Sequence, residues 1–453
     1  DSPASLPIHN NAQEQQLRNP VIKRKLSFGR QHFESRKTKQ KLRDPLMTYV
    51  SKILTQMTDV FKPQQKATLA LLNALMCFSG RATMRNLARY DAGSVKRLRR
   101  WASVGFQFFD LNQRILTHKQ ALSFDQQRLS SEHKSSRQAI IIDATFLKKS
   151  GKHTEGLGWF HNGSSRAIKK LERGLEMTLI AGINLDERAA YALDVYQTLE
   201  HSSLEMARAE LTKNSKYYHQ LSKYVVADGY YARGGFVSDL CAHHFEFVTL
   251  LRKDAALRYL YEGEYGGHGR PRCYAERVDY RDLSTWNRDD GLIDHKTVYS
   301  KVVNYAVWKR DLFVVVIVNE TGERRVLCST DLTLTVADVL ELYGQRFQIE
   351  FLFRDAKQHT GLGHAQALDS QAQEYFANAS FSALNVLRLE DRDQAILQGS
   401  SLRERICSIR SQKLRKYNKF LLNYFFSLLG ESPSGKKYQE AHQRASQVGV
   451  RAA

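Results

Sequence analysis

The order in which strand-like and helix-like segments follow one another after residue 136 limits the possible folds more than any other feature of the sequence. Apolar and β-branched residues dominate three segments typical of β-strands, "RQAIIIDATFL", "LEMTLIAGINL" and "AAYALDVYQTL". A helix near 200–222, a fourth strand "KYVVADGYY", a helix beginning near Gly234 and a fifth strand "FEFVTLLR" come next. This part of the chain is therefore predicted to be an α/β domain around one sheet.

Three strands, a helix, a strand, a helix and a strand is the order of a ribonuclease H-like α/β domain, which is the fold class that we predict. Residues 256–335 interrupt it with Gly-rich "EYGGHGRPR" and with the alternating segments "TVYSKVVNYAVW" and "DLFVVVIV". Such alternation has the period of strands. We therefore expect the α/β domain in two parts, 136–255 and 336–395, separated by a mostly β insertion.

The segments that flank this domain differ from it in composition. Residues 1–44 are polar and basic without a sustained period, which indicates either a flexible arm that orders on DNA or a solvated tail. Residues 45–125 have a helical pattern. Residues 396–453 are helical and basic, and they end in a polar tail.

The chain is strongly basic. It has 68 Lys and Arg against 47 Asp and Glu, a net charge of +21 and a pI near 9.7. Such a charge favours a polyanionic partner, with a generally basic protein as the alternative. The longest strongly apolar run, "FVVVIV", is far too short to span a membrane, and the five scattered cysteines are typical of reduced thiols. We expect a cytoplasmic protein that associates with the nucleoid when bound to DNA.

The segment "TMRNLARYDAGSVKRLRRW", residues 83–101, predicts two short helices joined by a tight turn. The structural positions are Leu87 and Ala88 on the inner face, Gly93 at the turn, Ser94 as a cap, and Leu98 and Trp101 as anchors. The exposed face of the second helix then carries Lys96, Arg97, Arg99 and Arg100. This pattern favours a helix-turn-helix that binds DNA, and an ordinary helical hairpin is the alternative.

The segment "YGQRFQIEFLFRDAK", residues 343–357, has the period of a buried helix with a polar stripe. At about 100° per residue, four polar residues fall on one side, namely Tyr343, Arg346, Glu350 and Lys357. Such a stripe must face something charged. The alternative is an internal salt-bridge ladder, because Arg346 with Glu350 and Glu350 with Arg354 are both i,i+4 pairs.

Two aspartates end apolar runs, Asp143 in "AIIID" and Asp228 in "YVVAD". Each alone is more typical of a turn or cap residue. In the predicted strand order, however, the first and fourth strands are neighbours, so both carboxylates lie at one edge of the sheet, within reach of Glu350. Three converging carboxylates suit two Mg²⁺ or Mn²⁺ ions roughly 4 Å apart, which promote attack on a phosphodiester. Tyr343, Arg346 and Lys357 would hold phosphates beside the cut.

The spacing Y-x2-R-x3-E-x6-K, with Asp143 and Asp228 upstream, resembles the signature of a large family of bacterial insertion-sequence DDE transposases. The segments "NLARYDAGSVKRLRRW", "LRKDAALRYLY" and "GRPR" extend the resemblance over most of residues 45–395. It implies a homodimer that binds the terminal inverted repeats of a mobile element, cleaves double-stranded DNA there and joins the ends to target DNA. Asp143, Asp228 and Glu350 would be its catalytic and metal-binding residues.

Relatives that form DNA hairpins have a Trp just before the strand that leads to the signature helix, and this chain has "ERRVLCST" there, with Arg325 near the usual Trp position. The remaining candidates for stacking on a flipped base are Trp308, beside Lys309 and Arg310, and Trp286, although packing is the more common role of such a Trp. In "GGHGRPR", Arg270 and Arg272 would enter a minor groove or belong to a solvated loop.

Two alternatives to an active transposase stay open. One is a domesticated descendant that binds element ends without catalysis, against which the intact Asp143, Asp228 and Glu350 argue. The other is a ribonuclease H-like endonuclease that cuts DNA without joining it. The two activities share the same metal chemistry and differ only in whether water or DNA attacks.

Overall fold

The computed structural model describes residues 45–90, 93–124, 137–163, 171–199, 202–265, 267–403, 406–429 and 436–451. The basic arm expected at residues 1–44 lies outside these ranges. No helix in the described ranges is long and apolar enough to cross a membrane.

Short helices precede the sheet, as the sequence predicts for residues 45–125. They are α2 (Pro45–Gln56), α3 (Lys62–Cys77), α4 (Met84–Leu87), the 3-10 turn η1 (Ala88–Tyr90), α5 (Val95–Ala102) and α6 (Phe108–His118). The predicted cap of α5 is confirmed, because the Ser94 hydroxyl accepts a hydrogen bond from the Arg97 N–H. Leu98 is buried, whereas Trp101 is only half-buried, so Leu98 is the stronger anchor of α5.

The predicted strand order of the central sheet is confirmed. Its elements are β1 (Gln138–Lys148), β2 (Gly158–His161), β3 (Leu171–Asn184), β4 (Ala189–Gln197), α7 (Ser203–Lys213), α8 (Ser215–His219), β5 (Tyr224–Val226), α9 (Gly234–Ala242) and β6 (Glu246–Leu251). The strands lie in the order β4, β3, β1, β5, β6. β3 is antiparallel to its neighbours β4 and β1, and β1, β5 and β6 are parallel to one another. β2 is a short additional strand on β3.

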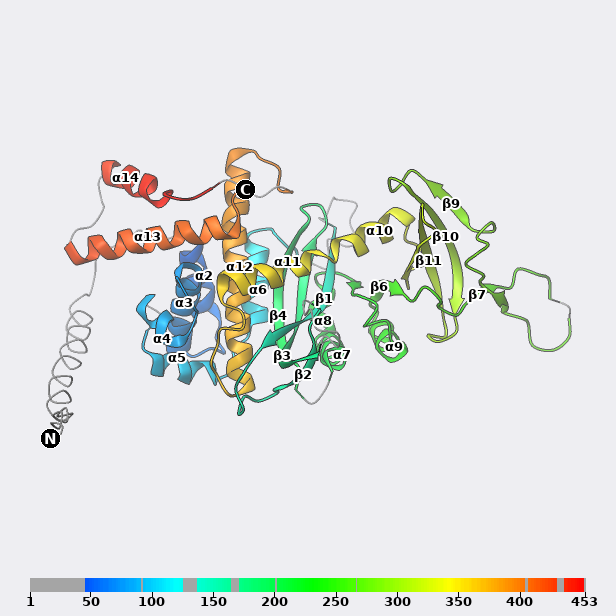
Figure 1. Ribbon diagram of the computed structural model, residues 1–453, viewed down its shortest axis with the longest axis horizontal. Coiled ribbons are helices and arrows are strands. Elements are labelled where there is room, and N and C mark those ends of the chain that lie inside the picture. Colours follow the sequence, from blue (N-terminus) through cyan, green and yellow to red (C-terminus); the bar gives the residue numbers. More distant parts are fainter. Residues whose placement is uncertain are drawn as a thin grey trace, which may run out of the picture.

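The expected insertion is rich in strands and continues the same sheet. It contains β7 (Leu257–Leu260), β8 (Tyr274–Arg277), β9 (Asn287–Asp290), β10 (Lys296–Tyr305), β11 (Arg310–Asn319) and β12 (Arg324–Ser329). β12 is hydrogen-bonded to β6, which joins the two regions into one sheet. In Figure 1 the insertion forms the lobe at the right, on the far side of β6 from β1.

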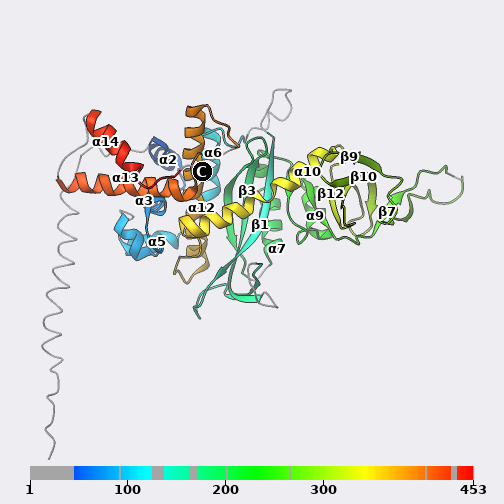
Figure 2. The same cartoon turned by 45° about the horizontal axis from the view of Figure 1, so that its top comes forward.

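Helices follow the insertion. They are α10 (Val336–Gln345), α11 (Gln348–Asp355), the π-helical turn η3 (Ala356–Thr360), α12 (Ser370–Gln398), α13 (Ile409–Leu429) and α14 (Lys436–Ser446). α12 contacts both α3 and β4, and its Asn378 and Asn385 side chains hydrogen-bond the backbone of β4. Figure 2 shows α10 and α11 crossing the sheet beside β1, where the candidate site lies.

Candidate active site

Asp143 and Asp228 follow the last paired residues of two neighbouring parallel strands. Ile141 of β1 is paired with Val226 of β5, and each aspartate comes two residues later, Asp143 within β1 and Asp228 just after β5 has ended. Because side chains alternate along a strand, Asp143 lies on the same face of the sheet as Ile141. β5 ends at Val226, so the carboxylates lie where β1 loses its partner on that side.

β1 continues beyond Asp143 to Lys148, in agreement with the predicted strand "RQAIIIDATFL", because residues 144–148 remain paired with β3 after β5 has ended. Asp228 does lie in a turn: its Oδ1 accepts a hydrogen bond from the Tyr230 N–H at 2.9 Å, and its carbonyl oxygen accepts one from the Thr249 hydroxyl. The hydrogen bond from Thr249 holds the Asp228 backbone against β6.

The prediction of one helix from Tyr343 to Lys357 is wrong. α10 ends at Gln345, a turn at residues 346–347 follows, and α11 begins at Gln348. The Arg346 N–H bonds to the Tyr343 carbonyl and the Glu350 N–H to the Phe347 carbonyl, and this three-residue spacing tightens the chain as in a 3-10 turn. Lys357 lies in the π-helical turn η3, so the expected stripe is divided among three elements.

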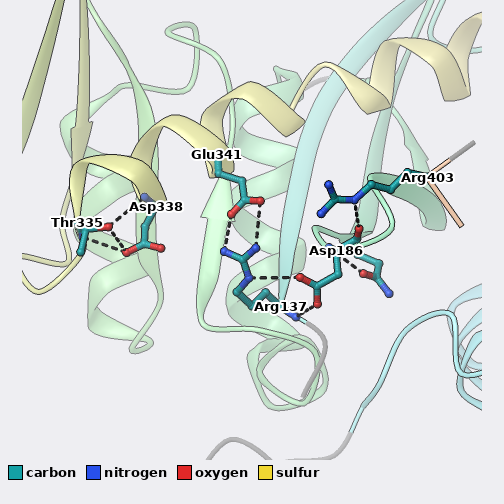
Figure 3. Close-up of polar contacts among 7 residues, drawn as sticks. Arg137, Asp186, Thr335, Asp338, Glu341 and Arg403 are labelled. Atoms are coloured by element: carbon teal, nitrogen blue, oxygen red, sulfur yellow. Dashed lines mark hydrogen bonds and ion pairs between the residues drawn. The ribbon is translucent and has the colours of Figure 1, made fainter. Parts of the chain in front are cut away.

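α10 is fixed at its start and along its length (Figure 3). Thr335 and Asp338 form a reciprocal capping box at its first turn. Arg137, the residue before β1, donates two hydrogen bonds to Glu341 of α10, Nη1 to Oε2 at 2.5 Å and Nη2 to Oε1 at 3.1 Å. Arg137 also pairs with Asp186 between β3 and β4. These contacts join the helix that leads to Arg346 to the strand that carries Asp143.

The Arg346 guanidinium bridges two of the three predicted carboxylates. Its Nη1 lies 3.4 Å from Asp143 Oδ2 and its Nη2 lies 3.2 Å from Glu350 Oε1, and only 16% of the side chain is exposed. One half of the alternative salt-bridge ladder is therefore present. The other half is not, because Arg354 pairs with Asp355.

The environment of Asp143 disfavours a charged carboxylate. Burial raises its pKa to about 7, and repulsion from Asp228 and Glu350 adds to this, whereas Arg346 and a hydrogen bond from the Ala144 N–H act in the opposite direction. Both other carboxylates therefore act on Asp143, and a bound cation would favour its ionised form.

The three carboxylates do not form a metal-sized cluster in this conformation. In the described ranges, no three His, Cys, Asp or Glu side chains are placed to hold a metal ion. The physical reason is that Arg346 lies between Asp143 and Glu350 as their counter-ion. The donor set itself suits a hard divalent cation, because it consists of carboxylate oxygens.

Arg346 Nε is buried without a hydrogen-bond partner in the described part of the chain, which leaves the Arg346 guanidinium incompletely satisfied.

Two more predicted site residues, Tyr343 and Arg325, lie near this centre, and Lys357 is half-buried in η3. The Tyr343 ring lies 5.8 Å from the Arg346 guanidinium, and burial raises the pKa of Tyr343 while Arg346 and Arg325 act against it. Arg325, on β12, is therefore a neighbour of Tyr343. Burial lowers the pKa of Lys357, whose side chain has no hydrogen bond or ion pair with any described residue.

The predicted DNA-binding residues away from this centre lie on the surface. Four are exposed on α5, namely Lys96, Arg97, Arg99 and Arg100. Arg270 and Arg272 are exposed in the loop between β7 and β8, where the Arg272 guanidinium lies 5.1 Å from the Tyr261 ring. Their contacts with DNA stay predictions.

The tryptophans differ from expectation. Trp308 is 8% exposed and packs against Tyr305 and Phe247, and Trp286 is 5% exposed and donates a hydrogen bond to the Tyr259 hydroxyl. Neither ring is free for a base in this conformation. Trp159 on β2 is 70% exposed and is the more accessible ring. The sequence does not indicate its exposure, because one aromatic residue on a short strand has no distinguishing pattern.

A family model described as the transposase DDE domain matches residues 134–386, which include Asp143, Asp228 and Glu350. No curated protein matches the chain. A similar solved structure is a cryo-EM structure of a piggyBac transposase synaptic complex with hairpin DNA, with 9% sequence identity, a TM-score of 0.37, and coverage of 90% of this chain and 83% of that chain.

Proposed function

This chain belongs to the transposase DDE domain family, and on that premise we propose that it is an insertion-sequence transposase of the Y-x2-R-x3-E-x6-K type. It binds the terminal inverted repeats of its element, cleaves the DNA ends and joins them to target DNA. The observation that carries the proposal is the arrangement of Asp143 on β1 and Asp228 just after the adjacent parallel strand β5, with Glu350 linked to Asp143 through Arg346.

The catalytic fold is of the ribonuclease H-like type. The strand order β4, β3, β1, β5, β6 supports this, with an antiparallel hairpin on one side and parallel strands on the other. Asp143 lies on the central strand of that order, and Asp228 lies in the turn after the parallel neighbour β5. Glu350 comes from a helix that follows the insertion, so three distant segments supply the site.

Asp143, Asp228 and Glu350 would hold the divalent cations, Mg²⁺ or Mn²⁺, two per site. When bound, these ions activate the attacking hydroxyl and stabilise the leaving oxygen of the phosphodiester. The chain's own residues orient the DNA strand. Arg346 would bind a phosphate oxygen at the cut, because a guanidinium recognises phosphate through several parallel N–H groups, and its Nε has no partner in the described ranges.

The remaining polar residues are assigned to the DNA backbone and to the substrate ends. Tyr343, Arg325 and Lys357 would hold phosphates next to the cut, on either side of Arg346. The exposed basic face of α5 would enter a major groove of the terminal repeat. We assign the active assembly as a homodimer, since two element ends must be cut and joined together.

The test is cleavage and joining of a DNA duplex taken from the sequence that flanks the reading frame. Asp143→Asn, Asp228→Asn and Glu350→Gln should each abolish strand cleavage in Mg²⁺ and leave duplex binding within about twofold. Glu276→Gln, which changes an exposed carboxylate on β8, is the matched control and should cleave like the wild type.

The outcomes separate the alternatives. Binding without cleavage by the wild type would identify a DNA-binding protein that has lost catalysis. Cleavage without joined products would identify an endonuclease. Retained cleavage by Asp228→Asn would remove the carboxylate assignment altogether.

A further inference from the structure

A hollow of about 330 Å³ lies in the N-terminal helical region, beside the segment that joins α3 to α4. Three arginines line it at four-residue intervals, Arg81, Arg85 and Arg89. The other lining residues are Ser79, Gly80, Thr83 and Asn86, so the hollow has no acidic lining residue. None of these arginines belongs to the basic face of α5.

The three guanidiniums have no counter-ion among the described residues. Each arginine is exposed, and none forms an ion pair or side-chain hydrogen bond with another described residue. Three adjacent arginines that the fold leaves unpaired are therefore available to an anion from outside.

The backbone beneath the arginines is held in place. The Asn86 amide donates hydrogen bonds to the carbonyl oxygens of Ser79 at 2.7 Å and Arg81 at 2.9 Å. The Ser79 N–H donates to the Tyr90 hydroxyl, and the Tyr90 ring packs against Phe420 of α13. Such a preorganised base lowers the entropic cost of ordering a ligand.

The positive field extends beyond the hollow toward the sheet. Arg81 lies near Lys149, the residue after β1, and burial together with the Arg81 charge lowers the pKa of Lys149 to about 8. The Ala82 N–H donates a hydrogen bond to His364 Nδ1, which ties the hollow to the loop after η3. Lys149 follows Asp143 by six residues, which along an extended strand is about 20 Å.

We propose that the hollow formed by Arg81, Arg85 and Arg89 binds phosphates of the DNA backbone at a second contact, separate from the catalytic carboxylates and from α5. This inference rests on the proposed function for the identity of the polyanion. A duplex has a phosphate about every 3.4 Å of axis on each strand, so DNA engaged at the carboxylates has several more phosphates within reach of the hollow.

The experiment measures DNA affinity of the full chain at several salt concentrations, with a fluorescent duplex of arbitrary sequence. Replacing all three arginines with Ala should make the plot of log K against log salt less steep. The magnitude of its slope should fall by about 1 to 2, because each neutralised phosphate contributes about 0.9. Arg444→Ala on α14 also removes one exposed arginine and should leave the slope unchanged. The triple Lys variant should keep the slope and bind less tightly, because it retains the charge and loses the guanidinium fork.

Three results would overturn the proposal or limit it to another ligand. If the triple Ala variant has the wild-type slope and an unchanged melting temperature, the hollow does not bind DNA and the proposed function stands. If inorganic phosphate raises the melting temperature of the wild type but not of the triple variant, and the slopes agree, the hollow binds a free anion instead. If the wild type itself binds no duplex, the proposed function fails.

Discussion

Arg137 and Glu341 form a two-bond ion pair between the start of β1 and α10. The first residue lies six positions before Asp143, and the second lies five positions before Arg346. This pair therefore connects the two segments whose side chains meet at the catalytic centre. Although 52% of the Arg137 side chain is exposed, its two parallel hydrogen bonds restrict the orientation of α10.

Arg137→Ala and Glu341→Gln are expected to lower the cleavage rate by about 10- to 100-fold, since small displacements of catalytic groups are costly. Stability should fall by less than about 1 kcal/mol, because exposed ion pairs contribute little. Rates and melting temperatures measured side by side will show this difference. Lys253→Ala, which breaks the exposed pair with Glu323, is the control. Equal cleavage rates for Arg137→Ala and Lys253→Ala would show that the ion pair between Arg137 and Glu341 does not position the site.

A second prediction concerns Asp194 on β4. Burial raises the pKa of Asp194 to about 7, despite hydrogen bonds from the Tyr196 hydroxyl and the Val195 N–H. The native state thus holds a proton that the unfolded state has lost between pH 4 and 7. Its contribution to stability is present at pH 4 and is lost as the pH rises toward 7, at about 1.4 kcal/mol per unit of pKa shift.

Asp194→Asn keeps a hydrogen-bond acceptor and removes the ionisation. The variant should therefore gain stability relative to the wild type as the pH rises, and the difference should be largest at pH 8 and small at pH 4. Thermal unfolding of both proteins across that range measures it. A stability difference that does not depend on pH would contradict the raised pKa.

A third prediction concerns Trp308, whose proposed stacking on a flipped base conflicts with its burial. Trp308→Ala should lower stability by about 3–5 kcal/mol, as for other large core truncations. Trp308→Phe should cost much less, because the indole Nε1 is buried without a hydrogen-bond partner in the described ranges. Denaturing gels of cleavage products test the functional role: a missing hairpin species in the stable Phe variant, with wild-type nicking, would restore Trp308 as a stacking residue.

The sequence predicts the strand order because each strand is a long apolar run, and such runs are a local signal. It also predicts that Asp143 and Asp228 lie at one place, since neighbouring strands follow from the order. The extent of β1 beyond Asp143 is predicted as well, because "RQAIIIDATFL" continues to Leu147 and β1 ends at Lys148. The break at Arg346 is missed because the apolar period continues through it, and a local pattern does not show the ion pairs of Arg346 with Asp143 and of Glu341 with Arg137 that accompany the bend.

The last prediction concerns Arg346, which is at once the counter-ion of Asp143 and Glu350 and the proposed ligand of the scissile phosphate. Arg346→Lys keeps a positive charge, but a single ammonium cannot make the parallel contacts of a guanidinium. Cleavage should therefore fall by about 100- to 1,000-fold, as when one stabilising donor of a transition state is removed, while duplex affinity changes by less than about threefold. Arg354→Lys, in the helix α11 that follows Arg346 and paired with Asp355, is the control and should cleave normally. Single-turnover rates at saturating protein separate the two effects, and a Lys variant that cleaves at the wild-type rate would reduce Arg346 to a simple counter-ion.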